Sequence, residues 1–124
     1  MENLPKSQRL HGRDCLGGLF REGGRGASGK IAARALPNDT GETRMAAVAG
    51  KSLGKANKRT RMRRLIRAAF RIQKDSLPAG WDLALVARPG LLEAQWPDIM
   101  RDVAKAVERA VRDATASPRR TPPA

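Results

Sequence analysis

The chain has 124 residues, with 25 Lys and Arg against 12 Asp and Glu, which gives a formal net charge of +13. It holds no apolar run near the ~18 residues that cross a bilayer, and its first residues, MENLPKSQRLHG, lack the apolar block of a signal peptide. One cysteine, Cys15, excludes an intrachain disulfide, and with His11 as the one histidine a zinc site would need carboxylate ligands. The composition predicts a small cytoplasmic domain that binds a polyanion and no membrane.

The first third of the chain is predicted to hold a helix and two strands. Residues 13–22, RDCLGGLFRE, form the helix, with an apolar face of Leu16, Leu19 and Phe20. The glycines after it indicate a flexible loop: Gly23, Gly24 and Gly26. Residues 29–36 and 43–49 are predicted strands, and the turn sequence PNDTG between them favours a β-hairpin.

Residues 57–74, NKRTRMRRLIRAAFRIQK, are predicted to form a helix with one apolar side and one basic side. The apolar residues recur at helical spacing: Met62, Leu65, Ile66, Ala69 and Phe70. A cationic arc lies opposite them, and the chain holds no acidic residue from Thr43 to Lys74. Arginine predominates on this arc, and its planar guanidinium suits bidentate contact with phosphate. The pattern favours nucleic-acid binding over a merely solvated charged face.

The last third is predicted to hold a buried strand and a helix. Residues 81–87, WDLALVA, are typical of a buried strand. Trp96-Pro97-Asp98 opens the helix, whose apolar stripe is Ile99, Val103, Ala106, Val107 and Ala110. The residues alone give the element order α-β-β-α-β-α, with room for one more short strand. We expect one domain over residues 1–114 and a Pro- and Arg-rich disordered tail over 115–124.

The basic helix and the segment before it resemble the signature of the bacterial ribonuclease P protein component. That signature runs roughly K-x-x-G-x-A-x-x-R-N-x-x-K/R-R-x-x-R-E, and residues 51–71 match it from Lys51 to Arg71. Flanking segments also match and fall in the family's order: Leu4-Pro5-Lys6, Leu19-Phe20-Arg21-Glu22-Gly23 and Gly80-Trp81-Asp82. The resemblance covers roughly residues 4–112. Four positions depart from it, because the family's usual Asn, Glu, aromatic and Tyr are here Thr60, Ala68, Leu16 and Ala35.

The resemblance implies an α+β fold, a small α/β sandwich of order α-β-β-β-α-β-α with helices packed on a mixed four-stranded sheet, like the second domain of ribosomal protein S5. It implies the protein subunit of an endonuclease that removes the 5′ leader of precursor tRNA, with active site and Mg²⁺ supplied by the RNA subunit. The protein would bind no cofactor or metal itself, carry no catalytic residue and require no protein partner. The residues that would bind the ribonuclease P RNA are Lys51, Lys55, Arg59, Thr60, Arg63, Arg64, Arg67 and Arg71. The candidate contacts to the leader are Arg9, Leu16 and Phe20.

Two other functions fit the composition. A structural RNA-binding protein of ribosomal type would share the charge and the basic helix, and a membrane-surface protein could use a basic amphipathic helix. An enzyme acting with its own side chains fits poorly, because the acids form no DxD or DxxE group near the basic segment and no glycine-rich loop has P-loop spacing.

Overall fold

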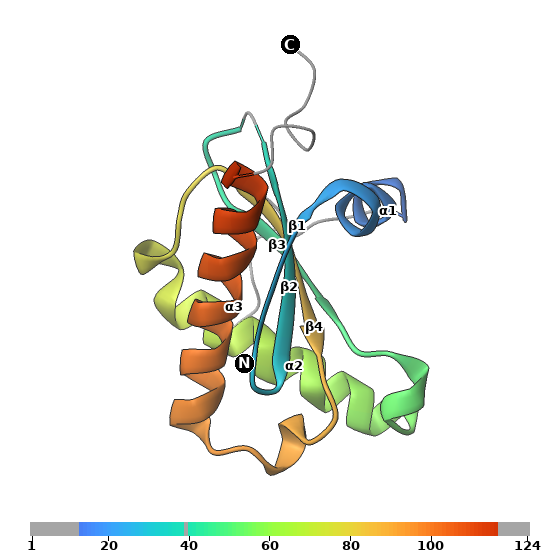
Figure 1. The fold of residues 1–124 in the computed structure, drawn as a ribbon. Coiled ribbons are helices and arrows are strands. Elements are labelled where there is room, and N and C mark those ends of the chain that lie inside the picture. The colour runs from blue at the N-terminus through green and yellow to red at the C-terminus, as the bar shows by residue number, and fades with distance from the viewer. Residues whose placement is uncertain (1–12, 39, 117–124) are drawn as a thin grey trace.

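The computed structural model describes residues 13–38 and 40–116, with side chains from residue 16 onward (Figure 1). The elements are α1 (Arg13–Glu22), β1 (Gly24–Ser28), β2 (Ile31–Pro37), β3 (Arg44–Val48), α2 (Ala56–Gln73), β4 (Trp81–Ala87) and α3 (Trp96–Ala116). Short 3-10 helices span Lys51–Leu53, Lys74–Ser76 and Leu91–Glu93. The order confirms the α-β-β-β-α-β-α prediction. Within the described residues, no helix is both long and apolar enough to cross a membrane.

The four strands form one mixed sheet in the order β1-β2-β4-β3. β4 pairs antiparallel with β2 and parallel with β3. The predicted hairpin between residues 29–36 and 43–49 is therefore wrong, because β4 lies between these strands. β4 is the most apolar strand, with Leu83, Ala84 and Leu85 fully buried, and such a strand belongs at the centre of a sheet. A turn sequence marks where the chain reverses and does not fix which strands pair.

The predicted glycine loop after α1 is instead strand β1, at one edge of the sheet. Gly24 and Gly26 face α3, and a Cβ at Gly26 would collide with the backbone of Ala106 and Ala110. The outer edge of β1 is covered by α3 as well, because Asp113 accepts a hydrogen bond from the Arg25 backbone N–H at 2.8 Å. The glycines therefore allow a close strand–helix contact rather than flexibility, and this contact shields a sheet edge.

One face of the sheet is covered by α2 and α3 and the other, in part, by α1 (Figure 1). The apolar stripes predicted for the two long helices are confirmed as core, except that Leu65 is half-buried. On the opposite face, α1 inserts Leu19 against Ala84. α3 runs to Ala116, two residues past the predicted domain boundary, and the predicted tail otherwise lies outside the described residues, as do Arg9, His11 and the side chain of Cys15.

Candidate nucleic-acid interface

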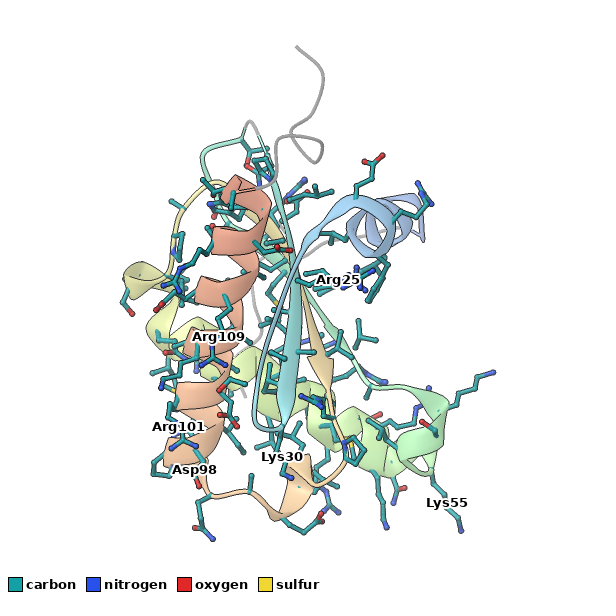
Figure 2. All side chains as sticks on the ribbon, in the orientation of Figure 1. Arg25, Lys30, Lys55, Asp98, Arg101 and Arg109 are labelled. Carbon is teal, nitrogen blue, oxygen red and sulfur yellow. The ribbon has the colours of Figure 1, made fainter. Side chains whose placement is uncertain are left out.

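The amino-terminal end of α2 is positively charged. Its first turn contains no acidic residue, and no side chain caps the helix at Lys55. Lys51 and Lys55 are exposed, and Figure 2 shows Lys55 extending away from the body of the protein. The unsatisfied N–H groups and the partial positive charge of a helix amino-terminus attract anions. This end of α2 can therefore hold phosphate oxygens.

The arginine face of α2 continues this charge along the helix, away from the buried stripe: Arg59, Thr60, Arg63, Arg64, Arg67 and Arg71. Arg64 is exposed and the other members of the face are half-buried. Arg59 Nε donates a hydrogen bond to the Ala49 carbonyl oxygen at 3.2 Å, which ties the helix to the end of β3. Arg63 Nη2 donates to Thr60 Oγ1 at 3.1 Å, so the threonine hydroxyl orients a neighbouring guanidinium. The structure thus brings these six predicted residues onto one side of one helix.

A second basic surface lies on the face of the sheet that α1 leaves partly uncovered. We call it the open sheet face, and it consists of Arg25, Ala27, Ala32, Arg34, Val48 and Val86 together with Phe20 of α1. Phe20 is 38% exposed, and the Arg34 guanidinium carbon lies 5.4 Å from its ring centroid. Arg34 Nη1 also donates to the Phe20 carbonyl oxygen at 2.8 Å. Figure 2 shows Arg25 on the side of β1 where α1 lies.

One position where the family commonly has an aromatic residue lies on the covered face of the sheet. Ala35, where the family commonly has Tyr, is fully buried with Ile31 and Ala33 on the face covered by α3. Arg34 alternates with these residues and therefore lies on the open sheet face. Leu16 is half-buried in the small cluster around Leu19. Of the two leader candidates that the structure describes, Phe20 is therefore the exposed one.

Sequence reasoning also left cations out of the candidate site. The predicted contact residues do not include Arg34, although its strict alternation with buried neighbours indicates that it faces away from them. Lys58 and Arg61 are exposed on α2 but lie outside the arginine face. Among the side chains that the structure describes, no three of His, Cys, Asp and Glu gather as a metal site would require.

Comparison with known proteins identifies the family. The family model for ribonuclease P matches residues 4–111. The ribonuclease P protein component of Herpetosiphon aurantiacus is 34% identical over 109 residues, which are 86% of this chain and 87% of that one. The homologous component of a Roseiflexus strain is 35% identical over 108 residues, 86% of this chain and 88% of its own.

Solved structures of other proteins share the fold of this chain. The ribonuclease P protein from Thermotoga maritima superposes with a TM-score of 0.74 at 24% identity, covering 82% of this chain and 96% of that one. The Staphylococcus aureus protein gives 0.71 at 20% identity, covering 88% and 96%. The chain therefore belongs to the ribonuclease P protein component family, the protein subunit of the ribonucleoprotein endonuclease that matures the 5′ end of tRNA.

Proposed function

We propose that the arginine face, with Lys51 and Lys55, binds phosphates of the ribonuclease P RNA. The supporting observation is that α2 and the segment before it contain no acidic residue and that the guanidinium groups of the arginine face share one side of the helix. Several of these side chains are half-buried, and Arg59 and Arg63 are anchored by hydrogen bonds. Anchoring reduces the rotamer entropy that is lost when a long cationic side chain meets phosphate.

We further propose that the open sheet face binds the 5′ leader of precursor tRNA. Phe20 offers a ring on which an unpaired base can stack, and Arg25 and Arg34 lie where they can meet the phosphates beside it. The uncovered positions between them are small, because Ala27, Ala32, Val48 and Val86 leave the strand backbone accessible. Such a surface supports sequence-tolerant binding of a single strand.

The reaction itself is assigned to the RNA subunit, together with the Mg²⁺ ions it requires. α2 contains no carboxylate, so the proposed RNA-binding surface offers no pair of acidic side chains to hold two metal ions. The protein then acts by positioning substrate and by neutralising phosphate charge. Its location in the cytoplasm stays a prediction.

The phosphate contacts of α2 can be measured as a salt dependence. If about five cations neutralise phosphates of the ribonuclease P RNA, a log–log plot of affinity against salt should have a slope near −3.5 to −4.5. Arg64→Glu should weaken binding by about tenfold and flatten the slope by about one unit. Filter-binding titrations at several salt concentrations measure both quantities. Arg112→Glu on α3 is the matched control, since it changes net charge equally at an exposed site. A slope near zero, or equal losses in both variants, would contradict the proposal.

The leader contact predicts a loss that depends on the substrate. In the assembled holoenzyme, Arg34→Ala should weaken affinity for precursor tRNA about threefold to tenfold, because it removes one charged contact beside the stacked base. Affinity for mature tRNA, which has no leader, should not change. Single-turnover cleavage and binding at low Mg²⁺ measure this, with Arg112→Ala as the control. Equal losses for both substrates would show that Arg34 does not contact the leader.

A further inference from the structure

A pocket lies beside α2, on a flank of the helix that the arginine face does not occupy. It is a cavity of about 400 Å³ between the 3-10 helix Lys51–Leu53, the first turns of α2 and residues 89–93. We call it the 89–93 pocket, and its lining is Ser52, Leu53, Lys58, Arg61, Met62, Pro89, Gly90, Leu92 and Glu93. Ligand sites of single small molecules have volumes of roughly 300–1,000 Å³, so this space suits one nucleotide.

One wall of the pocket is a rigid turn that carries Glu93. The Leu91 backbone N–H donates to the Arg88 carbonyl oxygen at 3.3 Å, and the Glu93 N–H donates to that of Gly90 at 3.2 Å. Gly90 has a φ of +92°, a conformation that glycine adopts without strain. Leu91 is fully buried and anchors the turn to the core. The Glu93 carboxylate is therefore presented from a fixed backbone.

The facing wall carries cations around an apolar floor. Lys58 and Arg61 are exposed on α2, and Met62, which follows Arg61 along the chain, is buried. A third cation, Lys30, approaches the rim from the β1–β2 turn, since a Cβ at Gly90 would lie 3.2 Å from its Nζ. Figure 2 shows Lys30 at this end of the sheet. A planar apolar group could rest on the floor while an anion meets the cations.

The charged groups of this pocket do not pair with one another. Across residues 13–38 and 40–116, the side chains of Lys58, Arg61 and Glu93 make no hydrogen bond or ion pair. Charges of both signs thus line one hollow without a hydrogen bond or ion pair between them. This arrangement leaves the hydrogen-bonding capacity of all three groups available to a ligand that carries both an anion and hydrogen-bond donors.

We propose that the 89–93 pocket binds one unstacked guanine nucleotide of the RNA that the protein binds. A carboxylate only accepts hydrogen bonds, and guanine is the base whose Watson–Crick edge offers two adjacent donors, N1–H and N2–H₂. Glu93 would receive this pair, Leu53, Met62 and Leu92 would contact the base, and Lys58 and Arg61 would bind its phosphates. The inference rests on the proposed RNA-binding role of α2 and adds a base-specific contact to it.

One substitution tests this proposal by the direction in which it changes the affinity for RNA. Removing a carboxylate from a surface that meets a polyanion ordinarily strengthens binding, because a repulsion disappears. The guanine contact predicts the opposite, so Glu93→Gln should weaken binding of the full-length protein to the ribonuclease P RNA by about fivefold or more. Glu108→Gln, at an exposed site on α3, is the matched control and should cause no loss. Unchanged or tighter binding by Glu93→Gln overturns the proposal, and if Arg64→Glu still weakens binding, the role of the arginine face stands.

A second measurement identifies the base. Titration of the free protein with guanosine 5′-monophosphate should shift the backbone amide NMR signals of Leu53, Gly90 and Leu92, with saturation at severalfold lower concentration than with adenosine 5′-monophosphate. Glu93→Gln should abolish this preference while its unperturbed spectrum shows an intact fold. Equal shifts for both nucleotides, confined to the arginine face, overturn the pocket assignment. A guanine preference without any change in RNA affinity also overturns it, since the pocket would then take a free nucleotide.

Discussion

Gly26→Ala should lower the free energy of unfolding by about 2 kcal/mol or more, although the change adds a single methyl group. The new Cβ would collide with the backbone of Ala106 and Ala110 and come within 2.8 Å of the Arg109 Cβ. Backbone atoms cannot rotate away, so α3 must move off β1 or the strand must leave the sheet. Either shift would disturb the hydrogen bond at 2.6 Å from Arg109 Nη1 to the Ala27 carbonyl oxygen.

Urea unfolding of the full chain, followed by circular dichroism, measures this loss. Gly18→Ala is the matched control, because nothing lies within 4 Å of a Cβ at that position in α1. There the same change should raise stability by about 0.5–1 kcal/mol through helix propensity. If the two substitutions shift stability in the same direction, β1 is not packed against α3 as described.

This contact also shows where sequence reasoning failed. A cluster of glycines carries no periodic signal, so the local pattern predicts a loop. In the structure these glycines form a strand, because the close approach of α3 leaves no room for a larger residue on the strand that faces it. The helices and β4 were predictable, because each buries a continuous stripe or run of apolar residues. The order of the strands in the sheet was not predictable, because it depends on which strand is most apolar on both faces and not on the turn between two strands that follow one another in the sequence.

The proposed binding surfaces also differ in how far the sequence predicts them. The arginine face follows from one helix and its period, so it was predictable from residues 57–74 alone. The 89–93 pocket joins residues 52–62 to residues 89–93, and the distance between them in the sequence hides their proximity. The alternation of β2 indicates on which face Arg34 lies, but which strands and helix surround it became clear only with the sheet order. Acidic residues concentrate on α3, where Asp98, Glu108 and Asp113 have partners, whereas α2 carries none. The helix that we propose to bind RNA thus contains cations and no acidic residue, whereas α3 contains both.

Asp102→Ala should destabilise the protein by about 3 kcal/mol, because the buried carboxylate fastens the β1–β2 turn to α3. Asp102 is 3% exposed, and its oxygens accept hydrogen bonds from Ser28 Oγ and the Lys30 backbone N–H, each at 3.1 Å. Arg101 Nη2 approaches the same carboxylate at 3.6 Å. Gly29 lies between the two donors at a φ of +54°, and a Cβ there would collide with Asp102. Removing the side chain leaves two donors without their acceptor and a void behind them.

The size of the loss distinguishes hydrogen bonding from simple packing. Asp102→Asn keeps the shape and one acceptor oxygen, so it should recover about half of the stability lost in Asp102→Ala. Glu108→Ala, on the exposed surface of the same helix, removes a pair with Arg112 and should cost at most about 0.5 kcal/mol. Urea unfolding of the three variants gives the comparison. An Asp102→Ala loss as small as that of Glu108→Ala would mean that the turn is held by the sheet alone. A large loss would show that a buried carboxylate of α3 contributes strongly to holding β1, the edge strand that carries Arg25.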